Sequence, residues 1–189
     1  MKKILLSIVM IIVVLVVGFF VLNSYIYNEK QGDGLTQNFK EVTFWISGEP
    51  VTLIDGVAEA KTSPDGAFET VVHYFGNEVI HDIDGDGVED VVFLVTQETG
   101  GSGTFFYAVG ALKRDTGYTG TNAVYIDDRI APQTTEKGEG RQVVVNYTGR
   151  APGEPMSAEP SVAKSLVLLF DVETLQFGEV VQGFEGEER

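Results

Sequence analysis

The chain contains two different hydrophobic patterns, one near its start and one in the remainder. Residues 4–22 form an apolar run without a charged side chain, preceded by Lys2 and Lys3. About twenty apolar residues are enough to cross the ~30 Å hydrocarbon core of a bilayer as a helix. The run is longer than the apolar region of roughly 7–15 residues that is typical of a cleaved signal peptide, which is the alternative. We therefore predict one N-terminal transmembrane helix in residues 1–22, an uncleaved signal anchor with its lysines on the cytoplasmic side.

The second pattern consists of short apolar and β-branched stretches separated by glycine-rich turns. Residues 23–36 are polar and predict a tether, and residues 37–189 predict a single domain. No stretch of the domain follows a helical period, so we expect an all-β fold, an antiparallel sandwich or barrel-like domain of roughly 8–10 strands. Asp55-Gly56 is a two-residue hairpin signal. The predicted strands are residues 42–46, 51–54, 57–60, 70–75, 90–96, 104–112, 123–126, 142–147, 165–170 and 175–181.

Residues 82–90, Asp-Ile-Asp-Gly-Asp-Gly-Val-Glu-Asp, place four aspartates around two glycines. Ca²⁺ takes six to eight oxygen ligands, and such a loop supplies them from positions 1, 3, 5 and 9 and from the carbonyl at position 7, with glycine at position 6. An ion enclosed by this many protein oxygens keeps few positions for substrate, so we expect a structural ion rather than a catalytic one. The alternative is an ordinary turn rich in Asp and Gly. The predicted metal ligands are Asp82, Asp84, Asp86, Asp90 and the backbone carbonyl of Val88.

The flanking sequence distinguishes this loop from an EF-hand. Position 12 is Phe93 instead of a bidentate Glu, and residues 91–95 are apolar and predict a buried strand. With the preceding residues 75–81, Phe-Gly-Asn-Glu-Val-Ile-His, the loop resembles one FG-GAP repeat, the calcium-bearing unit of integrin-type β-propellers. The resemblance covers roughly residues 75–95 and implies the same ligands. A propeller needs about four or more blades and the sequence has no second copy, so the propeller fold is not implied.

The part of the chain after the predicted anchor is strongly acidic and has no cysteine. It carries all 28 Asp and Glu residues but 11 of the 13 Lys and Arg residues, a formal charge of −17. The basic residues form no cluster, which argues against nucleic acid and anionic lipid head groups as partners. Without cysteine the domain has no disulfide, so its core and a bound ion must stabilise it. Extracellular calcium modules bind with a Kd of about 10⁻⁴ to 10⁻³ M, which suits a site outside the cell.

Two segments resemble a group of uncharacterised, membrane-anchored bacterial proteins: residues 100–107, Gly-Gly-Ser-Gly-Thr-Phe-Phe-Tyr, and residues 129–136, Arg-Ile-Ala-Pro-Gln-Thr-Thr-Glu. That resemblance implies a bacterial envelope location and no particular activity. We expect a single-pass membrane protein with its domain at the cell surface or in the periplasm, a binding or adhesion module for an unknown protein or glycan. The alternatives are an envelope hydrolase with a carboxylate acid–base pair and a periplasmic inhibitor of a wall-degrading enzyme.

The proline-rich stretch at residues 150–160 predicts a long loop, because proline is excluded from central strands. Loops of this length in compact domains are often functional. Arg150 and Glu154 are therefore candidates for a second site.

Overall fold

The computed structural model describes residues 36–61 and 69–180. These residues all belong to one compact unit of the chain. The predicted transmembrane helix in residues 1–22 and nearly all of the predicted tether lie outside the described residues. Within the described ranges, no helix has the length and apolar character needed to cross a bilayer.

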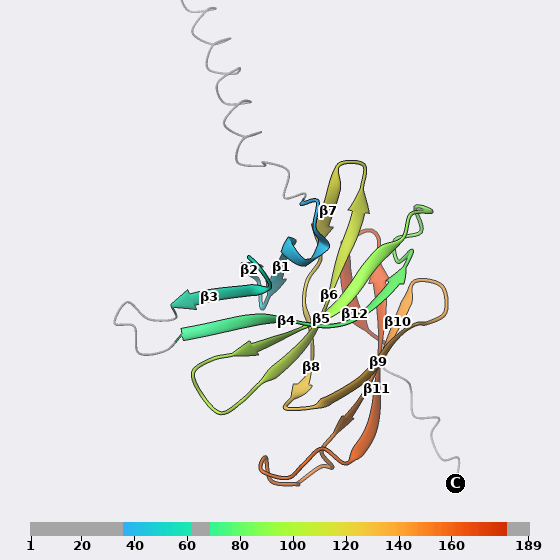
Figure 1. Cartoon of the computed structure of the whole chain (residues 1–189). Coiled ribbons are helices and arrows are strands. Elements are labelled where there is room, and N and C mark those ends of the chain that lie inside the picture. Colours follow the sequence, from blue (N-terminus) through green and yellow to red (C-terminus); the bar gives the residue numbers. More distant parts are fainter. Residues whose placement is uncertain (1–35, 62–68, 181–189) are drawn as a thin grey trace, which may run out of the picture. The chain divides into compact units, whose positions relative to one another are not determined.

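The described part of the chain is all-β, as predicted, with twelve strands and one short 3₁₀ turn (Figure 1). Every strand ladder within it is antiparallel. The elements are η1 (Phe39–Glu41), β1 (Thr43–Ile46), β2 (Glu49–Thr52), β3 (Val57–Lys61), β4 (Glu69–His81), β5 (Asp90–Glu98), β6 (Phe105–Arg114), β7 (Gly117–Gly120), β8 (Val124–Asp128), β9 (Ala131–Lys137), β10 (Gln142–Gly149), β11 (Val162–Asp171) and β12 (Gln176–Glu179).

The strands form three sheets. The largest has the order β3-β4-β5-β6-β7, and β8 also pairs with β6. The second has the order β12-β11-β10-β9, and the third is the β1–β2 hairpin. Most pairs of neighbouring strands are also consecutive in the sequence, as is usual for antiparallel sheets.

β5 is the strand that organises the interior, because both of its faces are buried. Val92 and Leu94 belong to one core cluster, and the residues between and beside them, Val91, Phe93 and Val95, belong to another. Successive side chains of a strand point to opposite faces, so a strand covered on both faces has a continuous apolar run instead of an alternating one. The prediction of a buried strand after the Asp-rich loop is therefore confirmed.

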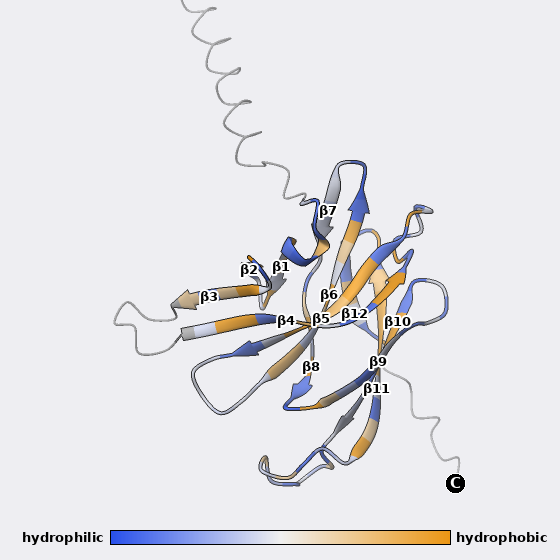
Figure 2. Cartoon of the chain, viewed as in Figure 1, coloured by the Kyte–Doolittle hydropathy of each residue, from blue (hydrophilic) through white to orange (hydrophobic). Residues whose placement is uncertain are grey.

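The first core cluster joins the six-stranded sheet to the four-stranded sheet. It brings Leu94 of β5 together with Val143 and Val145 of β10 and Leu168 of β11. Along its whole length β10 alternates half-buried and buried residues, as a strand with one face on a core does. Figure 2 shows apolar residues in the central strands and polar residues toward the turns. This arrangement is consistent with a sandwich, one of the two alternatives that the sequence predicted.

All ten predicted strands overlap observed ones, and two observed strands were missed, so the expected count of roughly 8–10 was too low. The missed strands are β7, which has a glycine at each end, and β9, which is polar and contains Pro132. Both strands lie at the edge of a sheet. An edge strand tolerates proline and polar residues because one of its sides needs no ladder partner, and such a strand lacks the apolar pattern that sequence analysis detects.

Candidate metal centre

The Asp-rich loop connects β4 to β5, with His81 at the end of one strand opposite Asp90 at the start of the other. Ile83 is fully buried in the first core cluster and anchors the loop to the domain. Gly85 and Gly87 have φ angles of +81° and +88°, a conformation that favours glycine. The glycine pattern therefore encodes the fold of the loop, and the buried Ile83 fixes the loop to the core.

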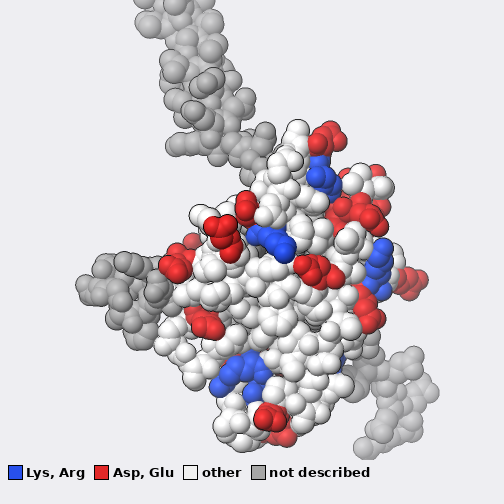
Figure 3. Space-filling model, in the orientation of Figure 1, with Lys and Arg blue, Asp and Glu red and all other residues white. Residues whose placement is uncertain are grey.

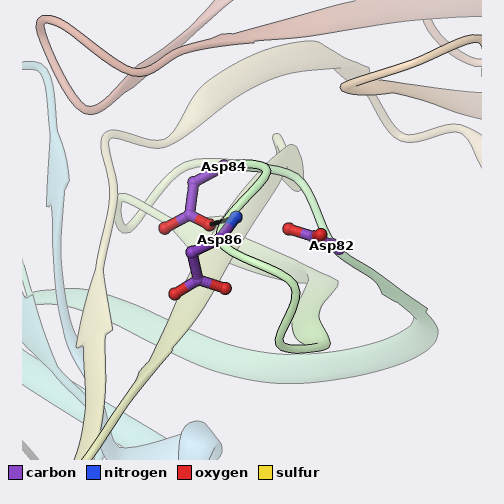
Figure 4. Close-up of side chains that lie close together, drawn as sticks. All are labelled: Asp82, Asp84 and Asp86. Atoms are coloured by element: carbon purple, nitrogen blue, oxygen red, sulfur yellow. Dashed lines mark hydrogen bonds between the residues drawn. The ribbon is translucent and has the colours of Figure 1, made fainter.

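Asp82, Asp84 and Asp86 come together in this loop (Figure 4). Each offers one carboxylate oxygen, and these three oxygens lie within 4.8 Å of one another. Two oxygens that bind one calcium ion at 2.3–2.6 Å are at most about 5 Å apart. The spacing of the three aspartates is thus compatible with a single shared metal ion, and it unites three of the five predicted ligands.

Backbone amides of the loop hold the carboxylates in place. Asp82 Oδ1 accepts a hydrogen bond from the Gly85 amide at 2.7 Å, and Asp82 Oδ2 accepts one from the Gly87 amide at 3.0 Å. Asp86 Oδ1 accepts from the Val88 amide at 2.7 Å. A carboxylate oxygen has two lone pairs, so an oxygen that accepts an amide hydrogen bond can also bind a metal ion.

Arg114, the last residue of β6, is the one cation in contact with these aspartates among the described residues. Its Nη1 lies 2.7 Å from Asp84 Oδ2 and 3.6 Å from Asp86 Oδ2. Sequence analysis missed this residue, although a signal existed. Two predicted strands, residues 90–96 and 104–112, form a hairpin in which Val91 lies opposite Ala111, and this register carries Arg114 back to the loop.

Asp90 stands apart from the other three aspartates. Its side chain has no exposed surface, and its two oxygens accept hydrogen bonds from the amides of Ile83 at 3.1 Å and Lys113 at 2.7 Å. Burial, with a smaller contribution from the charges of Asp84 and Asp86, raises the pKa of Asp90 to about 6. Asp90 therefore ties the start of β5 to the loop and to β6, and its role as a metal ligand stays a prediction.

The remaining predicted ligand, Val88, is an exposed residue in the last part of the loop. Its amide donates to Asp86, and the ligand role of its carbonyl stays a prediction. The β9–β10 connection lies beside the loop: His81 Nε2 is 2.7 Å from the Gly140 carbonyl oxygen, and Lys137 Nζ is 3.9 Å from a Glu89 oxygen. These contacts join the loop region to the second large sheet.

The loop at residues 150–160 uses its two candidate residues internally. Arg150 Nε donates to the Ala158 carbonyl at 2.7 Å, and its Nη1 donates to the Asp128 and Arg129 carbonyls at 3.2 and 3.0 Å. Glu154 accepts a hydrogen bond from the Ala151 amide at 2.8 Å. Arg150 thus fastens the loop to itself and to the end of β8, and Glu154 fastens the loop to itself, so these contacts are structural.

Comparisons with known proteins add no further information on the site. The chain matches no protein-family model, no curated protein and no solved structure. The FG-GAP resemblance of residues 75–95 therefore stays a prediction. Any assignment of function must come from the residues of this chain.

Proposed function

We propose that the protein is a membrane-anchored, calcium-binding module of the bacterial envelope, in which the ion stabilises an extracytoplasmic β-domain that binds a partner. The observation that carries the proposal is the spacing of Asp82, Asp84 and Asp86, whose carboxylate oxygens lie within 4.8 Å of one another. The predicted apolar helix at the start of the sequence supports the anchor.

Calcium is the metal that this donor set favours. All the side-chain donors are carboxylate oxygens, and hard oxygen ligands suit Ca²⁺ and Mg²⁺ instead of zinc or copper. Mg²⁺ demands a compact octahedron and retains several waters, whereas Ca²⁺ accepts six to eight ligands in a flexible geometry. A loop that can add a carbonyl from Val88 and a fourth carboxylate from Asp90 to the three aspartates fits the larger ion.

The position of the loop supports a structural role for the ion. It connects β4 and β5, and β5 contributes to both core clusters. Three carboxylates so close together repel one another, and Arg114 compensates only part of that charge. A bound divalent cation relieves the repulsion in the folded state alone, so it stabilises the connection between two central strands.

The surface supports a protein or glycan partner better than nucleic acid. Acidic side chains are distributed over the face shown in Figure 3, and basic side chains stand among them without forming a continuous patch. Binding to phosphate backbones draws on clustered Lys and Arg. The formal charge of the whole chain is −15, so a polyanion is repelled at long range.

The test is a thermal unfolding experiment on the full chain in a mild non-ionic detergent, with millimolar Ca²⁺, with Mg²⁺ and with a chelator. At a free concentration one hundred times the Kd, one bound ion adds about 2.7 kcal/mol to the stability of the native state. Asp86→Ala should abolish the calcium shift, because it removes one of the three clustered carboxylates. Asp86 is exposed, so its loss leaves the core intact. Glu98→Ala, which removes an exposed acid at the other end of β5, should keep it. Equal melting temperatures of the wild type in Ca²⁺ and in chelator would refute the proposal.

A further inference from the structure

The hairpin between β2 and β3 begins but is not completed. At the Asp55-Gly56 turn, the Ile54 amide donates to the Val57 carbonyl at 2.9 Å, and the Val57 amide donates to the Ile54 carbonyl at 3.1 Å. Beyond this one pair, β2 continues as the partner of β1, and β3 continues as the edge strand of the six-stranded sheet. Among the described residues no ladder joins β2 to β3, so the two arms of the hairpin separate.

The register shows which backbone groups of β2 face the space between the arms. Trp45 uses its amide and carbonyl on the side away from β2, in bonds to the Thr121 carbonyl and the Ala123 amide. Trp45–Pro50 is therefore a non-hydrogen-bonded pair of the β1–β2 ladder, and so is Thr43–Thr52 two residues along. The backbone groups of Pro50 and Thr52 consequently point away from β1, toward β3.

The same alternation applies to β3. The Gly56 carbonyl accepts a hydrogen bond from the Tyr74 amide of β4, whereas Val57 pairs with Ile54 on the other side. Two residues further on, the amide and carbonyl of Glu59 must therefore also point away from β4, toward β2. The amide and carbonyl of Thr52 thus point toward β3, and those of Glu59 point toward β2. No hydrogen bond between the two backbones is found among the described residues at this position.

A groove of about 690 Å³ occupies this space. Its deepest residues are apolar: Ile46 and Val72 are 4% and 3% exposed and belong to the second core cluster. Val51 and Ala58 also line the groove and pack against that cluster. An apolar floor between two strand edges that no described ladder joins is the environment that an inserted β-strand requires, since alternate side chains of the strand would cover the floor.

We infer that this groove binds an extended peptide segment of another protein, which enters as an additional strand between β2 and β3. Its backbone would pair with Pro50 and Thr52 on one side and with Glu59 on the other, and apolar side chains at alternate positions would pack on Ile46 and Val72. The insertion would connect the β1–β2 hairpin to the six-stranded sheet. In this mode of recognition, backbone hydrogen bonds provide the affinity and alternate side chains provide the specificity.

Charge indicates that the peptide is basic. Glu49 and Glu59 line the groove and are exposed, and none of the described residues lining it is Lys or Arg. Lysine or arginine side chains on the outward face of an inserted strand would lie beside these carboxylates. The partner segment is therefore extended, with apolar residues alternating with basic ones, and the acidic charge of the domain would also accelerate its approach.

This inference deepens the binding role proposed above but uses residues separate from the Asp-rich loop. The two proposals can therefore fail independently. If calcium raises the melting temperature but the peptide does not bind, only the proposal of a peptide-binding groove is overturned. If the peptide binds but calcium leaves the melting temperature unchanged, only the proposal of a metal centre is overturned.

The first experiment measures binding of a fluorescent, end-blocked octapeptide of alternating lysine and valine to the full chain in detergent, by anisotropy at physiological salt. A peptide of four lysines followed by four valines has the same charge and composition without the alternation. A third peptide carries N-methyl groups on the valine amides, so it cannot donate hydrogen bonds along that edge. We expect the second and third peptides to bind at least tenfold more weakly than the first. Equal binding of all three would overturn the inference, because nonspecific charge attraction would then suffice.

The second experiment tests the strand edge in the protein. Glu59→Pro removes the outward amide of β3, and Glu59→Gln removes only the charge. Proline is tolerated on edge strands where the amide faces outward, as Pro50 already illustrates on β2. We expect Glu59→Gln to weaken binding by no more than a few-fold and Glu59→Pro to weaken it at least tenfold, with circular dichroism confirming the fold.

Amide hydrogen exchange provides a readout that does not depend on any variant. Added peptide should slow exchange at the amides of Thr52 and Glu59 in the wild-type protein. Unchanged exchange at saturating peptide would overturn the inference. So would protection that develops without peptide as the protein concentration rises, because the occupant would then be a second copy of the chain.

Discussion

Arg114 and a metal ion would compete for the same carboxylates, which makes the charge of Arg114 a sensitive test of the metal centre. Its guanidinium contacts Asp84 and Asp86, two of the three aspartates that approach one another. Arg114→Gln removes the positive charge but leaves a side chain that can still donate a hydrogen bond. We expect this variant to bind calcium more tightly than the wild type.

The size of the effect follows from Coulomb's law. Arg114 Nη1 is 2.7 Å from Asp84 Oδ2. A calcium ion binds such an oxygen at 2.3–2.6 Å, so an ion on Oδ2 lies no more than about 5 Å from the guanidinium. At that distance in water, a single and a double positive charge repel each other by about 1.7 kcal/mol. Screening at physiological salt reduces this to about 1 kcal/mol, which corresponds to roughly fivefold in Kd.

Isothermal titration with CaCl₂ measures the change directly, at low and at physiological ionic strength. The gain in affinity should be larger at low salt, because the repulsion is less screened there. Arg129→Gln is the matched control, since Arg129 pairs with Asp128 at 2.9 Å and not with the three aspartates. The reasoning would be refuted if Arg114→Gln bound calcium no better than the wild type, or if Arg129→Gln gave the same gain.

Three further predictions concern stability, measured by urea unfolding in chelator. Because the folded pKa of Asp90 is raised from 3.8 to about 6, the folded state holds this proton more tightly than the unfolded state does. The Asp90 contribution to wild-type stability should therefore fall by up to roughly 3 kcal/mol as the pH rises from about 4 to above 6, and Asp90→Asn should remove that fall; an unchanged pH profile would contradict this. Asn122 Nδ2 donates to the Phe177 carbonyl at 3.0 Å and its Oδ1 accepts from the Phe177 amide at 2.7 Å, so Asn122→Ala should cost about 2–4 kcal/mol, and an unchanged free energy of unfolding would contradict this. A Cβ on Gly120 would lie 2.2 Å from the Thr43 carbonyl oxygen, so Gly120→Ala should lower the free energy of unfolding by at least about 3 kcal/mol. The control is Gly178→Ala, which should be close to neutral because a Cβ there meets no atom within 4 Å.

Local sequence was sufficient to predict ten of the twelve described strands and the Asp-rich loop, because their signals are short-range. Each of these ten strands is specified by its own apolar and β-branched residues, and the loop is specified by aspartates and glycines a few positions apart. Arg114 was missed because its relation to the loop depends on the β5–β6 register, a contact between residues 30 positions apart. The burial of Asp90 has the same origin, since its partner amide belongs to Lys113 of β6.

The incomplete β2–β3 hairpin shows why the groove could not be predicted. The Asp55-Gly56 signal correctly predicts the turn, and local rules would then extend the ladder along both arms. Completing it would add about three backbone hydrogen bonds, at a net value of about 1 kcal/mol each. Instead, Phe44, Ile46 and Leu53 of the β1–β2 region are buried in the second core cluster, where each contributes about 2 kcal/mol. Burial against the face of the large sheet therefore outweighs the ladder, and the cost is an edge on each arm that has no backbone partner among the described residues.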